Sequence, residues 1–133
     1  MREILFKAKD LKSKKWVFGS CVKYDEEHVF ILPLHEQAST LTYTQLFSLN
    51  AVMVDPETVC QYTGINDKNG VKIFEDDLLE YCGDCYVVAF FNGNFCCPEF
   101  YELQTKFPWN MAPESTDEVE VVGNIHDEQE NKQ

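Results

Sequence analysis

The chain has 133 residues, which fits one ordinary domain or two small ones, and its hydrophobic content of 44% is enough to build a core. We therefore expect a folded chain and not one that is disordered over its whole length. The formal net charge of -12 argues against nucleic acid as a partner, because phosphate binding depends on clustered lysines and arginines.

Two further features of the sequence indicate the compartment. No apolar run approaches the roughly 18 residues of a membrane span, and residues 1–7 reach charged side chains before a signal peptide could form. We therefore expect a cytoplasmic protein without membrane contact, in which the thiols stay reduced. The six cysteines are Cys21, Cys60, Cys82, Cys85, Cys96 and Cys97.

The N-terminal part of the chain predicts an antiparallel arrangement of short strands. Residues 4–8 and 16–24 are β-prone runs joined by a lysine-rich stretch, and residues 28–32 form a third run before Pro33. The basic stretch at residues 12–15 is short, and we interpret it as a solvated turn rather than a nucleic-acid patch. Three short strands so close together favour a meander.

The middle of the chain has a weaker pattern. Residues 39–47 fit either a threonine-rich strand or a short helix, and both alternatives stay open. Residues 51–54 and 71–74 predict short strands, and turn signals at residues 62–64 and 67–70 lie between them.

The C-terminal half carries the clearest alternation of apolar and polar residues. Residues 78–81, 86–91 and 95–97 predict three consecutive antiparallel strands of a meander. The expected turns are Gly83-Asp84 and Asn92-Gly93, because glycine and asparagine adopt the backbone angles of tight hairpins.

The predicted organisation is mainly β and has three parts. Residues 1–50 form an N-terminal β-hairpin or meander element, and residues 51–126 form the larger β domain, whose last strand is residues 119–122. Residues 127–133 contain no apolar side chain and are expected to be a solvated, disordered tail.

Two segments resemble the YopX family. Residues 54–77 read VDPETVCQYTGINDKNGVKIFEDD, and residues 119–125 read VEVVGNI; both are similar to ordered strings of that family. The resemblance implies a phage-encoded or prophage-encoded protein in which residues 51–126 form a small SH3-like barrel or roll. It implies no established activity and supplies no catalytic residues.

The sequence departs from the family pattern at two positions. Asp76 stands where the family usually has a glycine, and Cys60 also replaces a common glycine. At Asp76 we therefore expect the backbone to avoid the positive φ angle that glycine permits.

A pair of cysteines raises the question of a zinc site. Cys82 and Cys85 form a C-x-x-C pair, which supplies two of the four ligands that zinc needs. Cys96 and Cys97 are adjacent on a predicted strand and therefore point to opposite faces. The predicted Gly-Asp turn would place Cys82 and Cys85 opposite each other as ordinary thiols, and we predict neither a metal nor a redox pair. The three histidines, all remote in sequence, are His28, His35 and His126.

The acidic residues raise two possibilities, a calcium loop and a catalytic acid–base pair. The sequence pattern supports neither of them. Asp67, Asn69 and Asp76 fall at ligand positions of a calcium loop, but Ile65 stands where the first oxygen ligand is required, so we interpret residues 67–70 as a β-turn. An acid–base pair would need burial to separate two pKa values, and we instead expect a solvated rim. The residues of that rim are Glu75, Asp76, Asp77 and Glu80.

The sequence contains no glycine-rich phosphate loop and no nucleophile or zinc-protease motif, so we predict no enzyme, no cofactor and no catalytic, cofactor-binding or metal-ligating residue. An aromatic-rich segment fits either a plug over an open barrel end or a partner surface. Its residues are Phe100, Tyr101, Phe107, Trp109 and Met111.

The leading hypothesis is an accessory protein that binds protein, either a partner or a second copy in a homo-oligomer, through β edges and this aromatic segment. Two alternatives stay open: a small β-barrel that binds single-stranded nucleic acid, and an acidic mimic of DNA.

Overall fold

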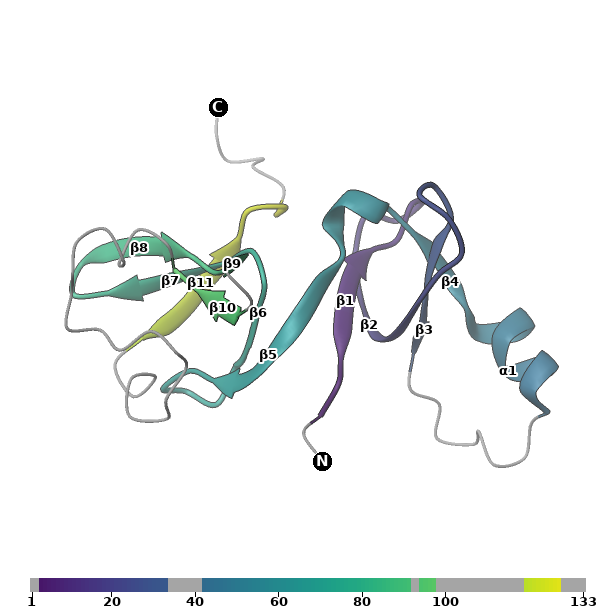
Figure 1. The fold of residues 1–133 in the computed structure, drawn as a ribbon, viewed down its shortest axis with the longest axis horizontal. Helices are drawn as coiled ribbons and strands as arrows, with labels where there is room; N and C mark the ends of the chain where they lie inside the picture. Colours follow the sequence, from purple (N-terminus) through teal and green to yellow (C-terminus); the bar gives the residue numbers. More distant parts are fainter. Residues whose placement is uncertain (1–2, 34–41, 92–93, 98–118, 128–133) are drawn as a thin grey trace. The chain divides into compact units, whose positions relative to one another are not determined.

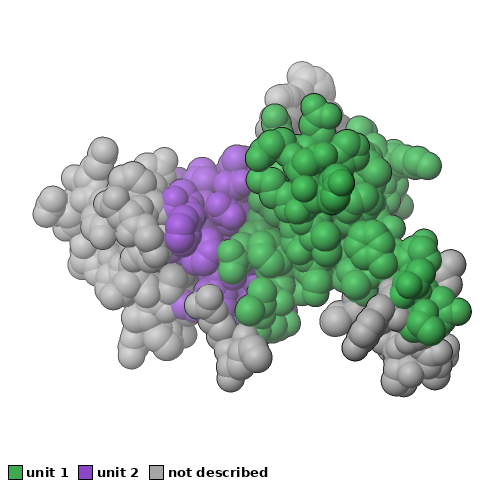
Figure 2. Space-filling model, turned by 45° about the vertical axis from the view of Figure 1, so that its right-hand side comes forward, with its two compact units in different colours: residues 1–61 green, residues 62–133 purple. Residues whose placement is uncertain are grey.

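The computed structural model describes residues 3–33, 42–91, 94–97 and 119–127, and these residues form mainly antiparallel β structure (Figure 1). The predicted fold class is therefore confirmed. The chain divides into two compact units, residues 1–61 and residues 62–133 (Figure 2). Within the described part of the chain, no helix is long and apolar enough to cross a membrane.

The first unit contains four antiparallel strands in the order β4-β3-β2-β1. The predicted opening hairpin is confirmed, because β1 pairs with β2 and the lysine-rich stretch connects them. In that turn the Asp10 carboxylate accepts the Lys12 backbone N–H at 2.8 Å. The strands are β1 (Phe6–Lys9), β2 (Trp16–Lys23), β3 (Val29–Pro33) and β4 (Val52–Val54).

The sheet of the first unit curls until β4 reaches the end of β1. The backbone N–H of Leu11 donates to the Met53 carbonyl at 3.1 Å, and that of Asp55 donates to the Lys9 carbonyl at 2.9 Å. Alternate residues of each strand therefore line a common core, while the others face outward. The buried core residues are Ala8, Val29, Ile31 and Val54.

The segment that fitted either a strand or a helix contains α1 (Tyr43–Asn50). The helix begins with a capping box, in which the Thr42 hydroxyl accepts the Gln45 backbone N–H and the Gln45 side chain accepts the Thr42 N–H. This T-x-x-Q spacing explains why the described part of the segment is helical although threonine favours strands.

Strand β5 (Cys60–Asn66) is a strand that the sequence reading missed. Within the first unit it pairs with β1, and its later residues pair with β6 (Lys72–Phe74) in the second unit. The turn signal at Gly64 has a physical basis, since Gly64 has φ +93 and lies where the register shifts between Tyr62 and Asn66. A short 3-10 helix (Pro56–Thr58) leads into this strand. Gly64 therefore marks an irregularity inside a strand rather than its end.

The described strands of the second unit form open sheets and no closed barrel. Strand β7 pairs with β11 and β8, and β9 pairs with β10, so the single meander predicted for this part of the chain is wrong. The strands are β7 (Asp77–Tyr81), β8 (Asp84–Val87), β9 (Ala89–Phe91), β10 (Asn94–Cys96) and β11 (Glu120–Asn124).

The apolar run at residues 86–91 is divided at Val88. The Val88 backbone N–H donates to Asp77 at 3.0 Å, and its carbonyl accepts from Asp76 at 2.8 Å. Its side chain is fully buried with Ile73 and Leu79 in the core of the second unit. These bonds separate β8 from β9, which joins another sheet. The predicted turn at residues 92–93 lies outside the described residues.

The first tight turn is shifted by one residue from the prediction. Tyr81 pairs with Asp84, so the two-residue loop is Cys82-Gly83 and not Gly83-Asp84. Both loop residues have positive φ angles, 54° for Cys82 and 88° for Gly83, as a turn that follows the twist of the strands requires. Cys85 consequently lies opposite Glu80, and the expected cross-strand pair of Cys82 and Cys85 is wrong.

We expect Gly83→Val to lower the free energy of unfolding by about 1 to 3 kcal/mol, because a β-branched residue is strained at φ +88. No atom lies within 4 Å of the added Cβ, so backbone strain alone produces the loss. Urea denaturation measures it, with Lys68→Ala as a control that removes only an exposed ion pair at 3.9 Å. Equal stability of the two variants would contradict this turn.

Candidate functional site

Asp67 is buried in the turn that precedes β6, and its carboxylate is occupied by backbone groups. One oxygen accepts the N–H groups of Asn69 and Val71, and the other accepts that of Val121 on β11, at 2.8 to 2.9 Å. Gly70 has φ +84, and its N–H donates to the Asp67 carbonyl. The interpretation of residues 67–70 as a β-turn is confirmed, and Asp67 fastens that turn to the last strand.

Asp77 is only 1% exposed, and its carboxylate also accepts hydrogen bonds that hold the fold together. One carboxylate oxygen accepts the Phe74 backbone N–H at 2.7 Å, and the other accepts the side-chain amide of Asn124 at 2.8 Å. The expectation that Asp77 belongs to a solvated rim is therefore wrong. A carboxylate tolerates such burial where donors compensate for the lost water, as these do.

Asp76 has φ +69, so the expectation that its backbone avoids a positive angle is wrong. Aspartate tolerates this region better than most residues, and three bonds hold the conformation. Its N–H donates to the Val88 carbonyl, its carbonyl accepts the Ile125 N–H, and its carboxylate lies 2.9 Å from Nε2 of His126. A glycine could make the two backbone bonds but not the bond to His126.

The cysteines are distributed among different environments. Cys82 and Cys85 are exposed in the β7–β8 hairpin, whereas Cys97 is buried in the core of the second unit. Cys21 lies partly buried beside the core of the first unit, and burial raises the pKa of its thiol. The predicted aromatic segment at residues 100–111 lies outside the described residues, as do Cys96's side chain and the tail at residues 128–133.

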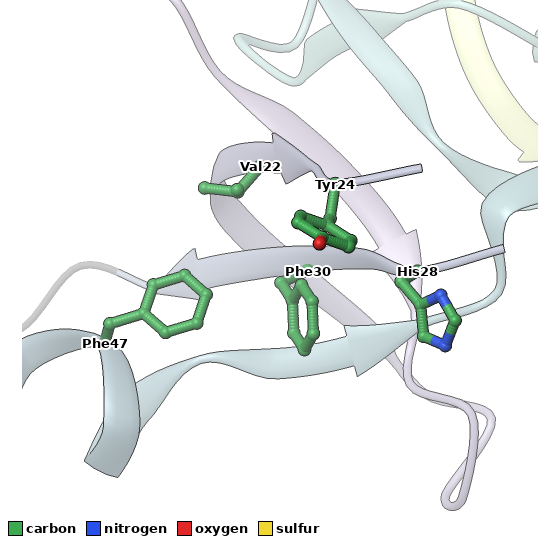
Figure 3. A pocket seen from close by; sticks show the side chains of 5 residues that line it. All are labelled: Val22, Tyr24, His28, Phe30 and Phe47. Atoms are coloured by element: carbon green, nitrogen blue, oxygen red, sulfur yellow. The ribbon is translucent and has the colours of Figure 1, made fainter. Parts of the chain in front are cut away.

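The described residues of the first unit form an apolar pocket of about 350 Å³ (Figure 3). Four of its five lining residues come from the β2–β3 hairpin, and the fifth comes from α1. Phe30 and Phe47 meet edge to face at 5.4 Å between ring centroids, which joins the helix to β3. The lining residues are Val22, Tyr24, His28, Phe30 and Phe47.

The pocket lies on the outward side of the curled sheet. Val22 pairs with Phe30, and Phe30 pairs with Met53 on β4, so the three side chains form one cross-strand row. Several apolar side chains here are exposed, Tyr24 most of all at 80%. Exposed apolar groups that border a concavity are typical of a binding surface.

The hairpin tip beside the pocket is acidic and ordered. The Asp25 carboxylate accepts the backbone N–H groups of Glu27 and His28 at 2.9 and 2.7 Å, and it contacts Nδ1 of His28 at 2.8 Å. The bond from the His28 ring is the main cause that lowers the pKa of Asp25. This geometry holds His28 at the edge of the pocket.

Because its pKa is lowered in the folded state, Asp25 contributes stability above the pKa of the unfolded chain, near 4, and that contribution disappears as the pH falls through the lowered pKa. We expect Asp25→Asn to be less stable than the native chain at pH 7 and nearly equal to it at the acidic end. Urea denaturation across this range measures the difference. Asp84→Asn, on an exposed carboxyl of β8, is the control, and a difference that is constant with pH would contradict the assignment.

Sequence reasoning did not find this pocket. Val22 and Tyr24 were assigned to a strand and Phe30 to another, but their common outward face depends on the register between the strands. Phe47 reaches the pocket only because its segment is a helix. The available signal was alternation: residues 18, 20, 22 and 24 share one side of β2 and its continuation, and three of them are apolar or aromatic.

Comparisons with known proteins place this fold in a family. A family model described as YopX protein matches residues 5–131, so the chain belongs to the YopX family. The crystal structure of protein EF1440 from Enterococcus faecalis is similar with a TM-score of 0.56 and 20% identity, and the match covers 95% of each chain. At that identity the likeness shows the fold alone. No curated protein matches the chain significantly.

Proposed function

We propose that this YopX family member is a non-enzymatic accessory protein, phage-encoded and located in the host cytoplasm, that acts by binding another protein. The observation that carries the proposal is the apolar pocket between the β2–β3 hairpin and α1. Aromatic rings that line a concavity are typical anchors of protein–protein recognition.

The acidic residues support a non-enzymatic role. Among the described residues, Asp67 and Asp77 are the buried carboxylates, and backbone and amide donors occupy their oxygens. Asp76 is oriented by His126. Groups engaged in this way hold turns and strands together, and they are not arranged to move a proton to or from a substrate.

In the part of the chain that the structure describes, the lysines near Trp16 are a feature that favours the nucleic-acid alternative. In the structure, however, the ammonium groups of Lys7 and Lys9 already lie over the Trp16 ring, at 4.5 and 5.3 Å from its centroid. Base stacking needs an accessible ring face, and here the protein's own side chains are the partners of the ring. The DNA-mimic alternative needs rows of exposed carboxylates, and Asp67 and Asp77 are turned inward.

The proposal is tested by recovering partners from phage-infected host cells with a tagged chain. Tyr24→Ala and Val22→Thr change the pocket at exposed positions, and Val71→Thr makes the same exposed change in the second unit. We expect partners that the native chain and Val71→Thr retain and that the two pocket variants lose. Recovery that is equal for all four chains, or absent for all of them, would overturn the proposal.

A further inference from the structure

We infer that the pocket receives one large apolar side chain from a basic segment of the partner protein, and that the acidic hairpin tip receives the lysine or arginine residues beside this anchor. The inference rests on the proposed function and adds the chemistry of the partner.

The size and lining of the pocket indicate which apolar side chain of the ligand it can receive. Its volume of about 350 Å³ is at the lower end of the range of ligand pockets, which suits one side chain better than an extended surface. The walls are the rings of Tyr24, Phe30 and Phe47 together with Val22, and hydrophobic burial against them favours an aromatic or branched aliphatic anchor.

The hairpin tip indicates the charge of the ligand residues beside the anchor. Asp25 is engaged by the backbone and by His28, so it orders the tip and is not the receptor for a cation. Glu26 forms an ion pair with Lys23 at 3.3 Å, and the side chain of Glu26 is 89% exposed, so a partner's cation can displace this pair at little cost. Glu27 is exposed as well, and no ion pair to its carboxylate occurs among the described residues.

Tyr24 supplies a second means of binding a cation. The residue is 80% exposed and belongs to the pocket lining, directly before the acidic tip in the chain. A guanidinium group stacks favourably on such a ring. An arginine next to the anchor can therefore contact both Tyr24 and a carboxylate.

The overall charge favours a basic protein over a second copy of this chain. Two molecules with a charge of -12 repel each other, whereas the same field attracts a basic segment and raises its association rate. The neighbouring carboxylates then add specificity at close range.

The experiment measures the binding of three labelled synthetic hexapeptides to the full chain by fluorescence anisotropy. The first has a central phenylalanine between lysines and arginines, the second has alanine in place of that phenylalanine, and the third keeps the phenylalanine between glutamates. We expect the first peptide to bind at least about tenfold more tightly than either of the others, and its affinity to fall with added salt.

Two variants separate the apolar and the charged contributions. Val22→Thr should weaken the first peptide about threefold without changing its salt dependence, and Glu27→Gln about threefold with a reduced salt dependence. Glu80→Gln removes the same charge from an exposed position on β7 and should leave binding unchanged. Val71→Thr is the matched control for the pocket.

The outcomes distinguish this inference from the proposed function. If the peptides with basic and acidic flanks bind equally, or if none of the three binds, the inference on partner chemistry is overturned. The proposed function then still stands as long as the pocket variants lose cellular partners that Val71→Thr retains. Equal weakening by Glu27→Gln and Glu80→Gln would show attraction by overall charge only, and would also overturn the role of the hairpin tip.

Discussion

Asp77→Ala should lower the free energy of unfolding by about 2 to 5 kcal/mol, because it leaves two buried donors without their acceptor. These donors are the Phe74 backbone N–H and the side-chain amide of Asn124, at 2.7 and 2.8 Å from the carboxylate. The residue is 1% exposed, so water cannot easily replace the lost bonds. Urea denaturation followed by circular dichroism measures the change.

The matched control is Asp84→Ala in the same sheet. Asp84 is exposed at the start of β8, and its loss should change stability by less than about 0.5 kcal/mol. The comparison separates the burial of a carboxylate from the removal of a negative charge, since both variants change the net charge equally. A loss at Asp77 no larger than that at Asp84 would show that Asp77 does not hold β11 against the β6–β7 turn.

The structural roles of some polar residues could be predicted from the sequence, whereas those of others could not. Asp67 and Gly70 lie within a local turn, whose hydrogen bonds join residues up to four apart, so their spacing alone predicted the turn. Asp77 meets Asn124, which is 47 residues further along the chain. No local pattern reports that contact, and the acidic run therefore looked like a solvated rim.

For the strands, too, local pairings could be predicted and long-range pairings could not. Hairpins with a polar loop, such as β1–β2, were predicted because both strands and their turn are adjacent in the sequence. The run at residues 86–91 looked like one strand, but the backbone bonds of Val88 to Asp76 and Asp77 divide it between two sheets. The turn at Cys82-Gly83 was misplaced by one residue, because Gly-Asp and Cys-Gly both satisfy a two-residue pattern until the register is known.

The pocket could not be predicted because it depends both on the register between strands and on a helix. Its hairpin was predicted, but the face that carries Val22 and Phe30 depends on their pairing across the sheet. Its remaining wall depends on α1, for which the sequence left helix and strand open. The capping box at Thr42 and Gln45 was the signal that could have favoured the helix, and with it the position of Phe47 beside Phe30.

Gly19→Ala should lower the free energy of unfolding by about 3 kcal/mol or more. An added Cβ would lie 2.2 Å from the carbonyl oxygen of Leu32 and 2.8 Å from Cα of Pro33, and both are backbone atoms that no side-chain rotation can move away. Gly19 pairs with Pro33 across the sheet, so β2 and β3 must separate at this point to admit the added atom. This is the close backbone approach that an interior strand glycine permits.

The same variant should also weaken partner binding, because the β2–β3 hairpin carries four of the five pocket residues. Gly123→Ala is the matched control, since its Cβ would meet only side-chain atoms, at 3.5 Å from Asp127 and 3.7 Å from Leu78, which is ordinary contact. We expect Gly123→Ala to retain most of its stability and all of its peptide binding. Equal unfolding midpoints in urea for the two alanine variants would contradict the observed register of β2 and β3, and with it the wall of the pocket.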